Sequence, residues 1–170
     1  MTLIAYRLSP RQYARRAFLG EGARRVGGRW NPRGVRAVYA SATLSLAMLE
    51  LLVDLSGPQD APDLVSFRLE FEAKLVTDLE LPKEWRKLRL SATRALGGDW
   101  LEEARSPVLR VPSFVIPSES NFVLNPAHPQ FRHIRINPKT AVEMNHGDTE
   151  STEKQREAKE VAPSNASPPG

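Results

Sequence analysis

At 170 residues and a formal net charge of +4, the chain is long enough for one domain with a single hydrophobic core. It contains no cysteine, which excludes disulfides, a thiolate nucleophile and a zinc ribbon. No apolar run approaches the roughly 18 residues of a membrane-spanning helix, and the first residues lack the pattern of a signal peptide. The composition therefore predicts a cytoplasmic protein without a membrane segment.

The first third of the chain is predicted to alternate strands and helices. We expect a strand over residues 2–8 and a short basic helix over 9–18. Residues 20–34 hold five of the ten glycines and are expected to form a long loop. A strand over 35–40 then leads into a helix over 43–55, which a serine or threonine caps.

The rest of the folded part is predicted to be mostly strands. They are expected over residues 64–71, 75–79, 108–116, 121–124 and 131–136. A helix is expected over 91–104, interrupted or joined at Gly97-Gly98. Strands interleaved with a few helices predict an α+β domain with mixed sheets over residues 1–138. Residues 139–170 are polar and offer no core, so they are predicted to be a disordered tail.

Eight arginines are concentrated between residues 11 and 36. They are Arg11, Arg15, Arg16, Arg24, Arg25, Arg29, Arg33 and Arg36. Such a cluster is either solvated surface or a site for a polyanion, such as nucleic acid or the phosphates of a nucleotide. Basic modules that bind single-stranded nucleic acid usually interleave aromatic residues, and the cluster contains only Tyr13, Phe18 and Trp30. Direct nucleic-acid binding is therefore kept as an alternative only.

Glu50 is the only charged residue between Arg36 and Asp54. The residues around it, 44–53, are apolar nearly all round, which predicts a buried helix. A carboxylate in such a helix costs on the order of several kcal/mol unless it is paired. Glu50 is therefore either one half of a buried structural pair or a functional acid.

The loop Gly27-Gly28-Arg29-Trp30-Asn31, the strand residue Tyr39 and Glu50 lie on successive elements. Alone, the loop resembles an ordinary turn, and the tyrosine an ordinary core residue. Together they predict one site. Arg29 would clamp a phosphate or carboxylate, and Tyr39 would stack on a flat ring. Glu50 would stabilise positive charge on a sugar, so the trio suits cleavage of a nucleotide's N-glycosidic bond.

Other catalytic patterns are weak or missing. The three histidines, at 128, 133 and 146, are not spaced for zinc, so no metal is predicted. The sequence has no Walker loop, Rossmann glycine pattern or Gly-x-Ser-x-Gly elbow. Ser113 lies in the strand predicted over 108–116, where it belongs to an ordinary strand pair or donates a hydrogen bond to an amide or phosphate in a pocket.

The ordered set of short motifs resembles the RES domain family, the toxins of RES–Xre toxin–antitoxin pairs. The motifs are Tyr6-Arg7, Gly22-Ala23, Gly27-Gly28-Arg29-Trp30-Asn31, Val38-Tyr39-Ala40-Ser41, Leu46-Ala47-Met48-Leu49-Glu50, Gly98-Asp99-Trp100, Val111-Pro112-Ser113 and the segment Asn121 to Phe131. The family is named for an arginine, a glutamate and a serine, which match Arg29, Glu50 and Ser113.

This resemblance implies a fold related to ADP-ribosyltransferase toxins, NAD as the substrate and toxicity through NAD breakdown. It implies that Arg7 and Arg29 bind NAD, that Tyr39 packs on the nicotinamide side, that Glu50 assists glycosidic cleavage and that Ser113 lines the nicotinamide pocket. The implied partner is an Xre-type antitoxin that blocks the pocket, and the resemblance allows a homodimer of the toxin.

Three questions stay open at the level of sequence. The acceptor of ADP-ribose can be water, phosphate or a protein, so the family includes NAD glycohydrolases, NAD phosphorylases and protein ADP-ribosyltransferases. The arginine cluster keeps a nucleic-acid-binding module as an alternative function. A protein that only binds a partner, with Glu50 in a salt bridge, is a third interpretation.

Overall fold

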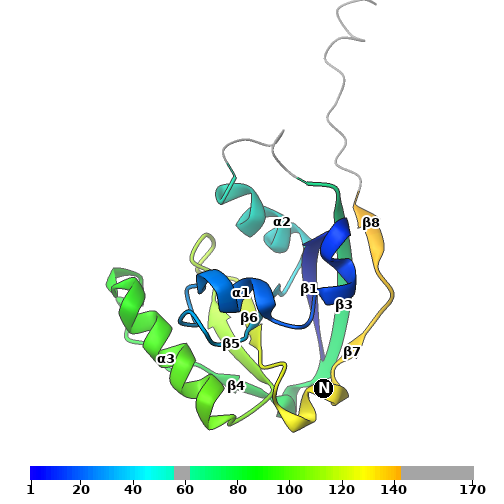
Figure 1. Cartoon of the computed structure of the whole chain (residues 1–170). Helices are drawn as coiled ribbons and strands as arrows, with labels where there is room; N and C mark the ends of the chain where they lie inside the picture. The colour runs from blue at the N-terminus through cyan, green and yellow to red at the C-terminus, as the bar shows by residue number, and fades with distance from the viewer. Residues whose placement is uncertain (56–61, 143–170) are drawn as a thin grey trace, which may run out of the picture.

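The computed structural model describes residues 1–55 and 62–142, and eight strands within them form one sheet (Figure 1). The strands are β1 (Thr2–Pro10), β2 (Val38–Ser41), β3 (Leu64–Glu72), β4 (Val76–Asp78), β5 (Val108–Pro112), β6 (Ser120–Leu124), β7 (Arg135–Ile136) and β8 (Thr140–Val142). The helices are α1 (Glu21–Val26), α2 (Leu44–Val53) and α3 (Leu90–Glu103). The expected α+β class, with a mixed sheet and few helices, is confirmed.

The sheet has the order β4-β5-β6-β2-β1-β3-β7, with β8 also paired to β3. Its longest ladder is antiparallel, from Thr2 opposite Glu72 to Pro10 opposite Leu64. In β3, every second residue from Val65 to Phe71 is buried, which is the alternation of a half-buried strand. Only the β4–β5 pair is parallel among the described strands. Strand β2 therefore lies near the centre of the sheet, between β1 and β6.

Two hydrophobic clusters cover different parts of the sheet. One packs around β1 and β3 and includes Leu69 and Phe71. The other joins Trp30 and Trp100 to β5 and β6. Figure 1 shows α3 at the β4–β5 end of the sheet and β8 at the opposite end. The Trp30 cluster fixes the loop before β2 to α3, and this loop carries Arg29.

The predicted long loop over residues 20–34 contains a helix, α1. Two of the five glycines mark the ends of this helix: Gly20 precedes it with φ +70° and Gly27 ends it with φ +74°. The predicted basic helix over 9–18 is a 3-10 helix over Arg11–Arg16 that follows a longer β1.

Helix α2 is less buried than its apolar sequence predicts. Thr43 caps it by accepting a hydrogen bond from Leu46 N at 3.0 Å. Leu46 and Ala47 are its buried residues, whereas Leu49 and Val53 are 36% and 55% exposed. The helix packs on β1 and β2 with one face only. The prediction of a buried helix is wrong, and Glu50 lies in a half-buried one.

Two strand predictions near the end of the described chain were also too long. The first half of the range 131–136 belongs to a 3-10 helix over Pro129–His133, because His128 Nδ1 accepts a hydrogen bond from Gln130 N and starts a turn. The strand expected over 108–116 ends at Pro112, where a turn begins.

The predicted boundary at residue 138 falls before the last described strand. Strand β8 lies within the range expected to be the tail, and it pairs with β3. Backbone pairing to an open strand needs no apolar side chains, so composition does not reveal it. The remainder of the predicted tail, 143–170, lies outside the described residues.

The glycine pair in α3 permits a close contact between this helix and the loop before β2. A Cβ atom added at Gly97 would lie 1.9 Å from Trp30 O, and one at Gly98 would lie 3.1 Å from Pro32 Cδ. Of the two expectations for these glycines, an interrupted or a joined helix, the second holds, since α3 continues through them. They remove side-chain volume so that the loop can lie directly against the helix.

We expect Gly97→Ala to lower the free energy of unfolding by about 1–3 kcal/mol or more, because the new methyl overlaps a backbone carbonyl. Gly22→Ala is the matched control: this glycine is also helical and has no atom within 4 Å of an added Cβ. Its replacement should stabilise the protein by up to about 1 kcal/mol. Urea unfolding measures both, and equal effects would contradict the close contact.

Candidate active site

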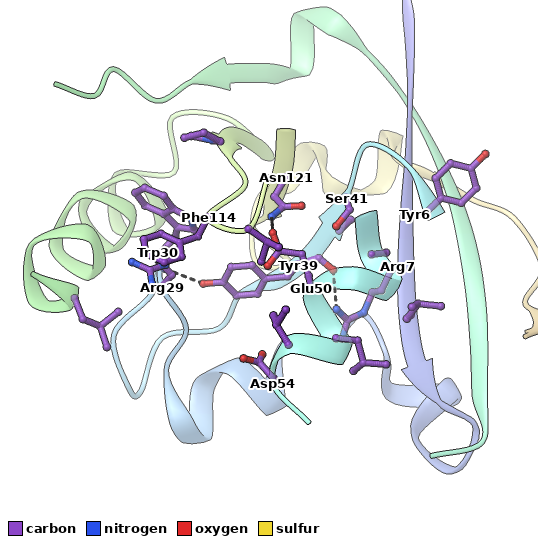
Figure 2. A pocket seen from close by; sticks show the side chains of 18 residues that line it. Tyr6, Arg7, Arg29, Trp30, Tyr39, Ser41, Glu50, Asp54, Phe114 and Asn121 are labelled. Atoms are coloured by element: carbon purple, nitrogen blue, oxygen red, sulfur yellow. Dashed lines mark hydrogen bonds between the residues drawn. The ribbon is translucent and has the colours of Figure 1, made fainter. Parts of the chain in front are cut away.

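A pocket of about 470 Å³ opens between α2, the ends of β1 and β2, and the turn after β5 (Figure 2). This volume is typical of small-molecule sites. Of the five residues predicted to form the site, Arg7, Arg29, Tyr39 and Glu50 line the pocket, whereas Ser113 does not.

Tyr39 holds the loop that carries Arg29. Its hydroxyl donates a hydrogen bond to Asn31 Oδ1 at 2.7 Å and accepts one from Trp30 N at 3.1 Å. Asn31 is fully buried, and its amide nitrogen donates to Ala23 O and Val35 O, both at 3.0 Å. Hydrogen bonds of the Tyr39 and Asn31 side chains thus hold the loop that contains Arg29.

Gly28 is required where the loop passes Tyr39. A Cβ atom at this position would lie 2.4 Å from the Tyr39 hydroxyl. Arg94 of α3 supports the same turn by donating from Nε to Gly28 O at 2.8 Å. The glycine motif predicted from the sequence therefore serves a close approach between backbone and side chain.

Arg29 lies over an aromatic ring. Its guanidinium carbon is 3.7 Å from the centroid of Phe114, a stacking contact that orients the group without using its N–H donors. Partial burial lowers the pKa of Arg29, while the nearby Glu50 and Tyr39 act to raise it. Within the described residues no hydrogen bond occupies the guanidinium, so its donors are available to an anionic ligand.

Arg7 is tied more closely to the protein. Its Nε donates to Ala17 O and its Nη1 to Tyr39 O, both at 2.8 Å. Burial lowers the pKa of Arg7 to about 10, so the group remains charged at neutral pH. Among the described residues, its hydrogen bonds leave Nη2 for a ligand. Arg7 therefore combines a structural role with a positive charge at the pocket wall.

Glu50 is the half-buried acid of the pocket, and the sheet holds one of its oxygens. Oε1 accepts from Ser113 Oγ at 2.7 Å and from Asn121 Nδ2 at 2.6 Å. Figure 2 shows Asn121 directed at Glu50 from β6. Neither partner is charged, and within the described part of the chain the carboxylate forms no salt bridge.

Ser113 is connected to the pocket through Glu50. It is fully buried behind Glu50, and its hydroxyl accepts from Val115 N at 3.1 Å and Ile116 N at 2.9 Å. Those bonds form the turn that ends β5 and use the oxygen's acceptor sites, which leaves its proton for Glu50. Ser113 is not among the residues that line this pocket, because its hydroxyl bonds Glu50 rather than facing the open space.

Three further pocket residues escaped the sequence-based prediction. Asn121 begins the motif segment Asn121 to Phe131, but its contact with Glu50 depends on the pairing of β6 with β2. Phe114 directly follows Ser113 and supports Arg29. Asp54 lines the pocket one helical turn after Glu50, and the i, i+4 spacing could have indicated it.

The sequence predicts neither a metal site nor a membrane-spanning helix. Within residues 1–55 and 62–142, no cluster of three or more histidine, aspartate or glutamate side chains is arranged to hold a metal ion. In the same residues, no helix combines the length and the apolar character needed to cross a bilayer.

Comparisons with known proteins agree in the family they indicate. The RES domain family model matches residues 4–145. A protein of Yersinia enterocolitica named Toxin Res is 37% identical over 134 residues, which cover 76% of this chain and 88% of that protein. A Prs ADP-ribosylating toxin of a Sphingobium species is 34% identical over 125 residues, covering 68% of this chain and 76% of that protein.

One solved structure shares the fold. It is a chain in the crystal structure of the M. tuberculosis MbcT–MbcA toxin–antitoxin complex, with a TM-score of 0.66. The alignment covers 84% of this chain and 85% of that chain at 19% sequence identity. At this identity the likeness concerns the fold alone.

The Tyr39 phenol provides a pH-dependent test of the site's framework. Burial raises the pKa of Tyr39 from the ordinary 10 to about 12. The hydrogen bond from Trp30 N and the charges of Arg94 and Arg29 lower this pKa, but their effect is smaller than that of burial. The folded state therefore favours the protonated phenol. Its contribution to stability is complete below about pH 10 and is lost as the pH rises toward 12.

We expect Tyr39→Phe to lower the free energy of unfolding by about 1–3 kcal/mol near neutral pH, since Asn31 and Trp30 lose their partner. The difference from wild type should shrink between about pH 10 and 12. Urea unfolding at several pH values measures it, with the exposed Tyr13→Phe as the control. A difference that stays constant to pH 12 would contradict the raised pKa.

Proposed function

The chain belongs to the RES domain family, and we propose that it is the toxin of a toxin–antitoxin pair that cleaves the nicotinamide–ribose bond of NAD. The observation that carries this proposal is the pocket in which the unoccupied donors of Arg29 and the half-buried carboxylate of Glu50 meet beside Tyr39. The same fold occurs in a toxin–antitoxin complex, and a relative is named as an ADP-ribosylating toxin.

Cleavage of the nicotinamide–ribose bond requires a site that binds the pyrophosphate anion and a carboxylate beside the ribose. When the bond between the ribose C1′ and the nicotinamide nitrogen breaks, its electron pair leaves with neutral nicotinamide, and positive charge develops on the ribose. A carboxylate beside the sugar stabilises this charge. We assign that task to Glu50, while Arg29 and Arg7 neutralise the pyrophosphate and hold the substrate in place.

Tyr39 and Ser113 are given different roles, the first in contact with the substrate and the second in contact with Glu50. The Tyr39 ring lines the pocket and is proposed to pack on the nicotinamide side of the substrate. Ser113 is proposed to act through Glu50, because its hydroxyl bonds the carboxylate and is buried away from the pocket. No metal enters this proposal, since the charged groups it needs are supplied by side chains.

The acceptor of ADP-ribose defines the reaction product. Water gives a glycohydrolase and inorganic phosphate gives a phosphorylase. A protein side chain gives an ADP-ribosyltransferase, and this alternative is favoured by the Sphingobium relative that is named for it. With water or phosphate, continuous turnover depletes the NAD of the cytoplasm, where we propose that the toxin acts.

The proposed protein partner is an Xre-type antitoxin that covers the pocket. The exposed apolar side of α2, with Leu49 and Val53, lies beside the pocket and offers it a contact surface. A homodimer through this surface is an alternative.

Nucleic-acid binding is not assigned to the arginine cluster. Arg24 and Arg36 pair with Glu21, and Arg11 pairs with Asp63. These pairs use part of the positive charge that a polyanion would need.

We expect Glu50→Gln to reduce nicotinamide release from NAD by about 100-fold to 1,000-fold, because the charge that stabilises the ribose cation is lost. The amide keeps the size of the carboxylate and can still accept from Ser113, so folding should be preserved. Glu103→Gln is the matched control, since Glu103 is exposed and pairs with Arg105. Its activity should equal that of wild type.

Chromatography of the products measures nicotinamide in each reaction. The assay is run with water alone, with inorganic phosphate and with a protein acceptor, so that it also identifies the product class. Absence of nicotinamide release from the wild-type protein under all three conditions would refute the proposed function. Equal activity of the two glutamine variants would refute the role of Glu50.

A further inference from the structure

Glu50 uses its two carboxylate oxygens unequally. Oε1 accepts both hydrogen bonds, from Ser113 Oγ and Asn121 Nδ2. Among the described residues no donor reaches Oε2. The two donors come from neighbouring parts of the sheet: Ser113 from the turn after β5 and Asn121 from β6. The sheet therefore fixes one oxygen and leaves the other for a ligand.

The orientation of the Asn121 amide leaves its oxygen without a hydrogen-bond partner in the described structure. In the described residues, its Oδ1 is the only buried side-chain polar atom without a hydrogen-bond partner. Rotating the amide by half a turn would exchange Oδ1 and Nδ2, and a carbonyl oxygen would then face the Glu50 carboxylate, where Nδ2 now lies at 2.6 Å. Two oxygen acceptors repel each other at that distance. The unmet acceptor is the consequence of directing the N–H group at Glu50.

Helix packing alone does not hold Glu50. The helix that carries it packs through Leu46 and Ala47, while Leu49 and Val53 on either side of Glu50 are exposed. A glutamate side chain also has several rotatable bonds, so it samples many conformations unless something restrains it. Asn121 is suited to this restraint, because it pairs with Ser41 of β2 and with Val111 of β5 inside the sheet.

We propose that Asn121 is a positioning residue that, with Ser113, holds Oε1 of Glu50 and thereby directs Oε2 at the ribose carbon where the bond to nicotinamide breaks. This inference rests on the proposed NAD cleavage. Asn121 also lines the pocket, but in this inference its amide acts through the glutamate, and its effect falls on the rate of bond cleavage rather than on substrate binding.

The first test is Asn121→Ala against Asn137→Ala. The control is matched in chemistry, because Asn137 Nδ2 donates to Glu70 Oε1 at 2.9 Å, away from the pocket. Asn121→Ala should lower kcat for nicotinamide release by roughly 10-fold to 100-fold and change KM for NAD by less than about threefold. Asn137→Ala should change neither. A raised KM with wild-type kcat would overturn the proposal, as would an unchanged kcat.

Asn121→Asp gives a readout that a purely structural role would not produce. Near neutral pH the introduced carboxylate faces Glu50 and cannot donate, so kcat should fall as in the alanine variant. When the pH is lowered and the introduced group gains a proton, it can donate again and kcat should recover relative to wild type. The other titratable or charged residues that line this pocket are the same in both proteins; they are Tyr6, Arg7, Arg29, Tyr39, Glu50 and Asp54. A loss that does not vary with pH would contradict the proposal.

Crystal structures of wild type and Asn121→Ala separate this inference from the proposed function. If the wild-type protein releases no nicotinamide, the function fails, but the position of Glu50 can still be compared. We expect one Glu50 conformation in wild type and a displaced or multiple conformation in the variant. A Glu50 side chain in the same single conformation in both proteins would overturn the positioning role.

Discussion

The hydrogen bond between the Tyr39 hydroxyl and Asn31 Oδ1 connects the parts of the pocket to one another. Tyr39 lies on β2, near the centre of the sheet, and its carbonyl also accepts from Arg7. The same side chain thus fixes the loop that carries Arg29, and its backbone fixes the second arginine. Gly28 and Gly97 provide the space that this arrangement needs, because a Cβ at either position would collide with the framework.

Local pattern was sufficient to predict that Arg29, Tyr39 and Glu50 lie close together, and all three line one pocket. The three residues lie on consecutive elements, so short connections bring them together. Alternation likewise predicted β3 closely. The surroundings of Glu50 were predicted less well, because an all-apolar helix indicates burial only if both faces are covered. In this fold α2 covers the sheet with one face, and its other face remains exposed.

Long-range pairing explains most of what the sequence did not reveal. Asn121 is 71 residues from Glu50, and the two meet because β6 pairs with β2. The buried position of Ser113 depends on the turn that its hydroxyl makes with Val115 and Ile116. The sheet and the turn after β5 thus supply the two donors to an acid on a half-exposed helix, and both hydrogen bonds fall on one oxygen of that acid.

The structure of Glu50→Gln crystallised with NAD tests most directly whether this pocket is an NAD-cleaving site. The account predicts pyrophosphate oxygens on the Arg29 guanidinium, with the nicotinamide ring beside Tyr39. The ribose C1′ should lie within about 4 Å of the Gln side-chain atom that replaces Oε2, as expected for a group that acts on the breaking bond. NAD bound elsewhere, or with its nicotinamide ribose remote from position 50, would contradict the account.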